Sequence, residues 1–386
     1  MKNSGLRWVI AVLLTCGLLF VGFICWILSA FAAGTKFYTP FVVIVTFAVI
    51  IFEITGVFMA PKLKKLVISF CVFLLICTVT VTAFELNRSY YRSLPVVSEQ
   101  GVNLNIYKPF EEHTEAVKLN EKTNLKIVTN IPIMDGATAL YPLYSAFAQA
   151  VYPKKEYDIY RSEVMCNTTP DAYNNLIVGE ADVIFVAQPS KEQRENAKKF
   201  NVELELTPIG REAFVFFVNS NNPVSGLTTQ QIQDIYSGKI TNWKEVGGNN
   251  ESIRAFQRPE NSGSQTMLQK LMEGKELMIP PKEDVVQSMG GIIEQTANYR
   301  NYKNAIGYSF LFFATEMVKN DEIKLLKVDG IYPDSNTIKN KQYPLAADFY
   351  AVTTGEKGPE VESLIEWILS PQGQYIVEKT GYTPLN

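Results

Sequence analysis

The first 85 residues contain three long apolar runs, at residues 8–33, 39–60 and 66–84. Each run is long enough to cross ~30 Å of hydrocarbon as a helix. Lipid offers no hydrogen-bond partners, so the backbone N–H and C=O groups of these runs must pair with one another within helices. The sequence therefore predicts a membrane module of three transmembrane helices over residues 1–85.

Lysine and arginine lie mostly on one side of these runs, at Lys2, Arg7, Lys62, Lys64 and Lys65. The loop between the first two runs carries only Lys36. Basic residues concentrate on the cytoplasmic side, so we expect the N-terminus inside and everything after residue 84 outside. Cleavage of the first run after Ala32 would leave this outer placement unchanged. The sequence predicts a multi-pass cell-membrane protein with a large extracellular C-terminal domain.

Glu53 lies inside the second apolar run. A carboxyl at that depth costs about 2.5–3.5 kcal/mol unless it is neutral or partnered. It is either a coupling or relay residue, or a carboxyl that is hydrogen-bonded to a Thr or Ser of a neighbouring helix. Because no other acidic or basic side chain accompanies it in that run, we favour the hydrogen-bonded interpretation.

The part of the chain beyond residue 85 is acidic, with 30 Lys and Arg against 37 Asp and Glu, a net charge of −7. Such a charge argues against nucleic acid and anionic lipid head groups as partners. It does not argue against one buried anion, because local N–H dipoles set the potential in a closed site. Cys166 is the only cysteine in this part, so no internal disulfide is expected.

The outer part divides into a polar linker or stalk at 86–122, without sustained periodicity, and a domain at 123–386. Short structure within 86–122 that packs on the domain is compatible with this pattern. From residue 124, short apolar stretches alternate with helical patterns, which predicts an α/β fold. The expected strands are at 125–128, 182–187, 212–219, 252–256, 305–313 and 345–352. An amphipathic terminal helix is expected at 360–379.

Three expected helix starts carry small polar residues after an apolar stretch, at 135–138, 167–170 and 258–264. A helix N-terminus presents unpaired N–H groups and about half a positive charge, which suits an anion. Arg258 adds a five-donor fork that fits phosphate or carboxylate. Each start could also be an ordinary capped helix, since Ser and Thr caps are common. Taken together, they predict a small oxyanion site.

Catalytic motifs are missing from the sequence. It has no Gly-x-x-x-x-Gly-Lys-Ser/Thr loop, no Gly-x-Ser-x-Gly elbow and no His-Glu-x-x-His. Its single histidine, His113, lies in the linker, so Ser262 has no identifiable base. We therefore expect a binding protein rather than an enzyme, with no cofactor and no metal.

Four stretches of the domain form distinctive motifs: Asn-Pro-Val-Ser-Gly-Leu-Thr at 222–228, Ile-Tyr-Ser-Gly-Lys-Ile-Thr-Asn-Trp at 235–243, Ala-Ile-Gly-Tyr at 305–308 and the stretch at 368–385. They resemble the solute-binding proteins of phosphate ABC transporters. The resemblance covers residues 124–386. It implies a two-lobed type II periplasmic-binding-protein fold, here preceded by three transmembrane helices. Lobe 1 would comprise 123–210 and 344–386, and lobe 2 would comprise 211–343, with crossovers near 208–214 and 343–349.

The resemblance also implies which residues hold the ligand. In the family, phosphate is bound by two polar loops of one lobe and by an Arg-x-x-x-Ser-Gly-Thr/Ser motif of the other. The matching positions here are Ala137, Thr138, Asn167, Thr168, Thr169, Arg258, Ser262, Gly263 and Ser264.

Two positions depart from the family pattern. Ala137 stands where many relatives carry Ser. The strand at 182–187 ends in Ala187-Gln188, where the best-known relatives carry an Asp that accepts the proton of hydrogen phosphate. Without that acceptor we expect weaker discrimination between phosphate and sulfate.

The implied function is the capture of phosphate or a related oxyanion for uptake through an ABC permease. The alternative is a non-transport extracellular sensor or assembly module that uses the same fold with a different ligand or none. Three spans favour this alternative somewhat, because a transport receptor needs only a tether.

Overall fold

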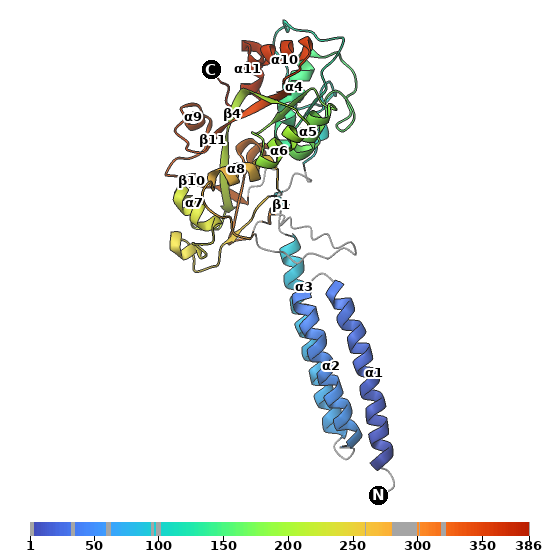
Figure 1. Cartoon of the computed structure of the whole chain (residues 1–386). Helices are drawn as coiled ribbons and strands as arrows, with labels where there is room; N and C mark the ends of the chain where they lie inside the picture. Colours follow the sequence, from blue (N-terminus) through green and yellow to red (C-terminus); the bar gives the residue numbers. More distant parts are fainter. Residues whose placement is uncertain are drawn as a thin grey trace. The chain divides into compact units, whose positions relative to one another are not determined.

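The computed structural model describes residues 4–31, 35–58, 63–93, 96–97, 102–258, 260–279, 299–300, 302–317 and 322–385. The chain divides into a helical N-terminal unit and a mixed α/β unit that starts at Pro95 (Figure 1). The α/β prediction is confirmed by this second unit.

The N-terminal unit consists of helices α1 (Ser4–Phe31), α2 (Thr35–Phe58) and α3 (Leu63–Ser93). Their segments Gly5–Ser29, Phe37–Phe58 and Lys64–Tyr90 are long and apolar enough to cross a membrane. Helix α3 continues past the expected end of the third run at residue 84, and an ion pair between Glu85 and Arg88 lies on this extension. The Thr15 hydroxyl donates to Glu53 at 3.0 Å, as the hydrogen-bonded interpretation of Glu53 requires.

One mixed sheet runs through the second unit, in the order β2-β3-β11-β4-β8-β6, with β9 paired to β4. Its strands are β2 (Met134–Gly136), β3 (Val183–Val186), β4 (Leu204–Asn219), β6 (Arg254–Ala255), β8 (Ala305–Phe310), β9 (Ile323–Leu325) and β11 (Ala346–Thr354). Two small ribbons pair β1 (Val96–Val97) with β7 (Tyr299–Arg300), and β5 (Gly226–Leu227) with β10 (Lys327–Val328).

The helices of this unit are α4 (Tyr141–Val151), α5 (Thr168–Val178), α6 (Lys191–Lys199), α7 (Thr229–Tyr236), α8 (Gly263–Leu271), α9 (Ser335–Lys339), α10 (Pro359–Leu369) and α11 (Pro371–Thr380). Short 3-10 turns lie at Leu104–Tyr107, Thr138–Leu140 and Trp243–Val246, and a π turn lies at Phe313–Met317.

The sheet joins two hydrophobic cores. One contains Phe147, Phe185 and Trp367, and the other contains Phe216 and Trp243. Strand β4 passes from the first core to the second, because its first half pairs with β11 and its second half with β8 and β9. The first predicted crossover lies on β4 and the second runs into the start of β11; the two strands pair antiparallel there (Figure 1). We keep the names lobe 1 and lobe 2 for the two sides.

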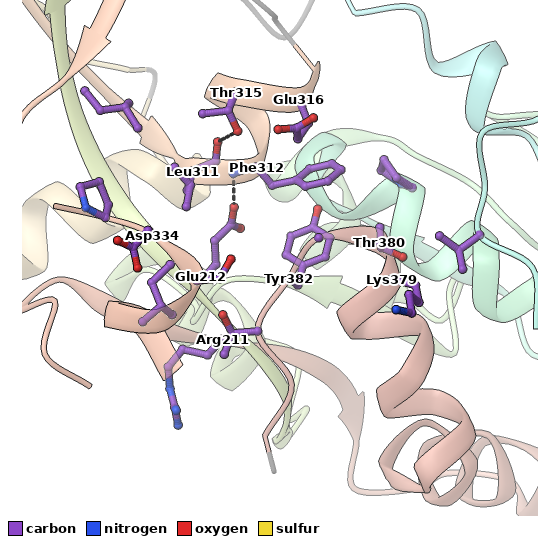
Figure 2. Close-up of a pocket in the computed structure, with 18 of the residues that line it drawn as sticks. Arg211, Glu212, Leu311, Phe312, Thr315, Glu316, Asp334, Lys379, Thr380 and Tyr382 are labelled. Atoms are coloured by element: carbon purple, nitrogen blue, oxygen red, sulfur yellow. Dashed lines mark hydrogen bonds between the residues drawn. The ribbon is translucent and has the colours of Figure 1, made fainter. Parts of the chain in front are cut away.

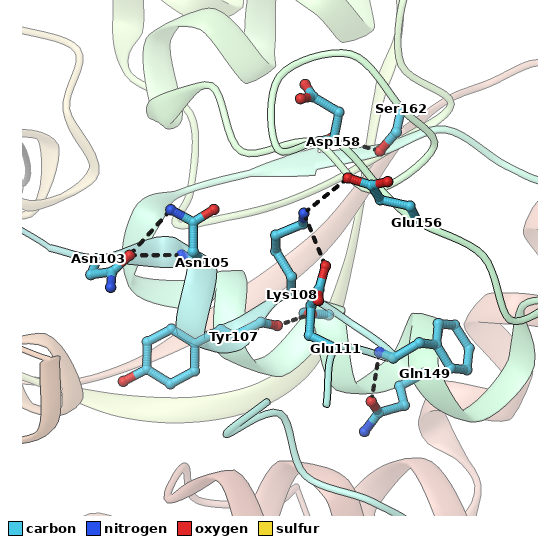
Figure 3. A network of polar contacts seen from close by, with 11 residues as sticks. Asn103, Asn105, Tyr107, Lys108, Glu111, Gln149, Glu156, Asp158 and Ser162 are labelled. Carbon is cyan, nitrogen blue, oxygen red and sulfur yellow. Dashed lines mark hydrogen bonds and ion pairs between the residues drawn. The ribbon is translucent and has the colours of Figure 1, made fainter. Parts of the chain in front are cut away.

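The segment 102–122, expected within a linker or stalk that could pack on the domain, packs against lobe 1. Tyr107 and Ala116 are buried in its core. Figure 3 shows the polar contacts of this segment: Lys108 pairs with Glu111, and the Phe110 N–H donates to Gln149 of α4. Gln149 in turn donates to the carbonyls of Ala116 and Val117. Spaced apolar side chains without periodicity were enough to anchor an irregular segment.

Two expected elements differ in the structure. Residues 125–128 form no strand. The Ile127 N–H donates to the carbonyl of Val151 at the end of α4, and the Ile127 side chain is buried in the core of lobe 1. The terminal helix is split at Ser370, because Pro371 cannot donate to the preceding turn and starts α11 at its first position.

Candidate functional site

The first predicted loop follows β2 at the edge of the sheet. Gly136 lies so close to β3 that a Cβ there would come within 2.5 Å of the Phe185 carbonyl. The Ala137 N–H donates to that same carbonyl at 2.9 Å. Thr138 then begins a 3-10 turn that leads into α4, and its side chain is buried.

Asp135, just before this loop, is completely buried and accepts four hydrogen bonds. The donors are the N–H groups of Gly136 and Asn167, at 2.7 and 2.8 Å, and the side-chain amides of Asn167 and Asn175, at 3.1 and 2.8 Å. Burial raises the pKa of the Asp135 carboxyl, while these hydrogen bonds oppose the rise. Asn167, which was predicted to bind the ligand, is therefore held by Asp135 and helps to position the second loop.

The second loop begins α5. Helix α5 starts at Thr168, whose φ is 68°. Asn167 occupies the cap position and makes no side-chain cap hydrogen bond, because Asp135 engages its amide. Thr169 is buried in the first turn of the helix.

The third loop leads from β6 into α8. Ser262 accepts a hydrogen bond from the Gln265 N–H and is therefore the N-cap of α8. An ordinary helix cap was the alternative to ligand binding for this residue. The Arg258 N–H donates to the Tyr308 hydroxyl at 2.8 Å and to Gln265 at 3.1 Å. These hydrogen bonds fix the backbone from which the Arg258 side chain extends. Gly263 and Ser264 lie in the buried first turn of α8.

A small pocket of about 30 Å³ lies where these elements meet, and we call it the interlobe pocket. Its lining includes Ala137, Thr169 and Ala187 of lobe 1, Glu212 and Asp348 of the crossover strands, and Gly263, Ser264, Ser309 and Phe310 of lobe 2. A Cβ on Gly263 would lie 3.4 Å from the Ala187 Cβ and 3.5 Å from the Thr169 hydroxyl. The first turns of α5 and α8, from opposite lobes, therefore meet at this pocket.

Four of the nine predicted residues line the interlobe pocket: Ala137, Thr169, Gly263 and Ser264. Thr138, Asn167, Thr168, Arg258 and Ser262 lie on the same loops but are not in its described lining. The Ala187 carbonyl accepts the Tyr173 hydroxyl at 2.8 Å, so it is engaged within lobe 1. The weaker discrimination between phosphate and sulfate, expected because Ala187-Gln188 contains no acid, stays a prediction.

Sequence reasoning missed the two acids that line the interlobe pocket. Asp348 pairs with Arg211 at 3.0 Å across the two crossover strands. Glu212 is buried and accepts the Phe312 N–H at 2.5 Å; burial raises the pKa of its carboxyl to about 8. The signal available in the sequence was the charged pair Arg211-Glu212, which directly precedes the apolar and aromatic run at 213–218 within β4.

A contact between the lobes closes one side of this region. Asn261, with a φ of 64°, accepts a hydrogen bond from the Ser190 hydroxyl at 2.8 Å and donates to Glu192 at 2.6 Å. Its carbonyl accepts the Gln193 amide at 3.1 Å. Ser190, Glu192 and Gln193 belong to the N-terminus of α6 in lobe 1, so Asn261 links the lobe 2 loop to lobe 1.

Comparison with known proteins agrees with this architecture. A family model described as a PBP superfamily domain matches residues 129–372. The chain belongs to the PBP superfamily. It is 25% identical over 257 residues to the phosphate-binding protein PstS of Bacillus subtilis, covering 65% of this chain and 80% of that protein. It is 26% identical over 236 residues to the PstS of Borreliella burgdorferi, covering 59% and 79%.

Among solved structures, the chain resembles a Clostridium perfringens protein described as a phosphate ABC transporter substrate-binding protein and solved with bound phosphate. The TM-score is 0.50 at 25% identity, and the match covers 66% of this chain and 98% of that one. The predicted family and fold class are confirmed by these matches.

Proposed function

We propose that this protein captures phosphate or a related oxyanion between its two lobes and delivers it to an ABC permease. The observation that carries the proposal is the meeting of the α5 and α8 first turns, where Gly263 approaches Thr169. Unpaired N–H groups and partial positive charge from two helix starts suit a small anion. The names of the relatives support phosphate as that anion.

In this proposal the binding domain lies outside the cell and the three N-terminal helices hold it in the membrane. The Lys62, Lys64 and Lys65 loop supports a cytoplasmic position for the N-terminus and for the second connection. The protein binds without catalysing a reaction; its single histidine, His113, is exposed on the segment that packs against lobe 1 and does not line the interlobe pocket.

Arg258 supplies the main charge-assisted hydrogen bonds to the anion in this proposal. Arg258→Ala should weaken phosphate binding by about 2–5 kcal/mol, the usual cost of truncating one partner of a buried charge pair. Arg258→Lys should also bind poorly, because a point charge does not reproduce the guanidinium fork. Isothermal titration calorimetry of the full chain in detergent, with phosphate and sulfate, measures both effects.

The matched control is Arg161→Ala, which removes the same charge from an exposed position of lobe 1. It should bind phosphate like the parent protein. If Arg258→Ala also binds like the parent, the anion site lies elsewhere. A parent protein that binds neither anion would favour the non-transport sensor or assembly module.

A further inference from the structure

A second cavity, of about 560 Å³, lies where both lobes meet strand β4, and we call it the hinge cavity. Its lining includes Tyr107 and Glu115 of the segment that packs on lobe 1, the end of lobe 1 at 379–383, Glu212 of β4, and Glu316 of lobe 2. Of the residues named for the two linings, only Glu212 is shared with the interlobe pocket. The volume is in the range of small-molecule sites.

Two buried polar groups of this lining have hydrogen-bonding capacity left over. The Tyr107 side chain is 6% exposed and extends away from Lys108 (Figure 3), and its hydroxyl makes no hydrogen bond within the described residues. Glu212 is also 6% exposed, and its Oε1 accepts the Phe312 N–H, whereas Oε2 has no hydrogen bond in the same part of the chain. Figure 2 shows the Glu212 carboxyl pointing toward Phe312 and Tyr382 of the hinge cavity. Buried polar groups are normally hydrogen-bonded, so these two are available to the polar atoms of a ligand.

Acidic side chains surround these two groups. Glu115 and Glu316 line the cavity from opposite lobes, and in the described part of the chain their carboxylates make no hydrogen bond and no ion pair. Both act on the Tyr107 hydroxyl: burial raises its pKa, and the charges of Glu115 and Glu316 raise it further. Asp334, the N-cap of α9, adds another carboxylate to the lining.

The basic side chains of the lining do not balance this charge. Arg211 is already paired with Asp348 at 3.0 Å, and Figure 2 shows it pointing away from the Glu212 carboxyl. Lys379 lies over the ring of Tyr375, with 5.6 Å between its Nζ and the ring centroid. With four acids in the lining and these two bases engaged elsewhere, the cavity favours a positively charged ligand.

The arrangement of the acids argues against a metal ion as that ligand. Within the described residues, no three His, Cys, Asp or Glu side chains are close enough together to hold one. Carboxylates at separate points of a cavity instead suit a ligand that carries its charges at separate points of an organic chain. Phe312 and Tyr382 supply aromatic surface in the same lining, which suits alkyl groups and ammonium groups alike.

We propose that the hinge cavity binds a small organic polyamine, whose ammonium groups donate hydrogen bonds to Glu212, Glu316 and the Tyr107 hydroxyl. Hydrogen bonds between an ammonium group and a carboxylate are charge-assisted and among the stronger ones in proteins. Because both lobes line the cavity, the bound polyamine contacts both of them without entering the interlobe pocket. This inference does not rest on the proposed oxyanion-binding function.

The test titrates spermidine into the full chain in detergent by isothermal titration calorimetry, at about pH 8.5 and physiological ionic strength. Burial raises the pKa of Glu212 to about 8, so its carboxyl is mostly ionised at this pH. A primary amine resembles the ammonium group of lysine, whose ordinary pKa is about 10.4, and stays protonated. The parent protein should bind spermidine saturably.

Two variants remove the buried acceptors singly. Tyr107→Phe deletes only the hydroxyl, and Glu212→Gln keeps an oxygen for the Phe312 N–H but places an N–H donor where Oε2 lies. Each should raise the spermidine Kd about 10- to 100-fold, the loss expected for one hydrogen bond to a charged group. The matched control is Glu366→Gln, which removes one carboxylate from the exposed side of α10, outside the described lining, and should leave the Kd unchanged.

Three results would overturn the proposal. The first is a parent protein without saturable spermidine binding. The second is a Tyr107→Phe protein that melts and binds spermidine like the parent; this variant decides the matter even if Glu212→Gln does not fold. The third is an equal loss of affinity in Glu366→Gln, because that pattern marks a general attraction between a cation and an acidic domain.

Discussion

Asp135 is the residue on which the geometry of the two lobe 1 loops depends most. Its buried carboxylate satisfies two N–H groups and two amides, all at 3.1 Å or less. Two of these donors belong to Asn167, so the start of α5 is held in place by the end of β2. A side chain outside the described lining of the interlobe pocket can therefore control where the lobe 1 groups of that pocket lie.

We predict that Asp135→Asn destabilises the domain and weakens phosphate binding. The new amide would face the amides of Asn167 and Asn175, leaving buried donors without acceptors at a cost of about 2–4 kcal/mol. The melting temperature of the full chain should fall by roughly 5–10 °C. The control is Asp182→Asn, an exposed carboxyl that accepts the Ile133 N–H and should melt like the parent. An Asp135→Asn protein with unchanged melting and phosphate affinity would show that the network is dispensable.

At the scale of elements, the loop before α8 and the start of α6 form the link between the lobes. The loop contributes Asn261, and the start of α6 contributes Ser190, Glu192 and Gln193. These hydrogen bonds exist only when the lobes are close together, so they favour the closed form. A ligand that is enclosed by the lobes leaves more slowly when the closed form is more stable.

Asn261→Gly should weaken phosphate binding about 5- to 50-fold, because it removes two side-chain hydrogen bonds, one of them to a carboxylate. Glycine tolerates the φ of 64° and keeps the carbonyl contact with Gln193, so the backbone is preserved. Equilibrium dialysis with radiolabelled phosphate gives the affinity. Asn201→Gly makes the same change at an exposed position that also has a positive φ, and it should have no effect on binding. If both variants bind phosphate with the affinity of the parent, the hydrogen bonds of Asn261 between the lobes do not contribute to binding.

For the whole molecule, the open question is on which side of the membrane the binding domain lies. We predict that Lys191→Cys, on exposed α6, reacts with an impermeant maleimide on intact cells, whereas Lys65→Cys reacts only after lysis. Both variants replace an exposed lysine in a background without the five native cysteines. The reason for the expected pattern is the basic loop at 62–65, which stays in the cytoplasm. The opposite labelling pattern would show that the topology is the reverse of the predicted one.

The sequence by itself determined the features that follow from local chemistry. Apolar length indicated three helices long enough to cross a membrane, alternation of apolar and helical patterns indicated the α/β class, and the family-like motifs indicated the fold. The caps were readable too, as Ser262 at the start of α8 shows. These features need only a residue and its near neighbours in the chain.

Only the tertiary structure decided which polar groups face the pocket and which serve the scaffold. Asn167 stays predicted as a ligand-binding residue, and the structure adds that Asp135, 32 positions away in sequence, accepts hydrogen bonds from its N–H and its side-chain amide. Residues 125–128 have strand-like composition but no strand beside them to pair with. Glu212 lines the interlobe pocket because β4 crosses from one lobe to the other at that point. Pairing partners, burial and the pKa values that burial shifts are set by distant parts of the chain, so no local pattern encodes them.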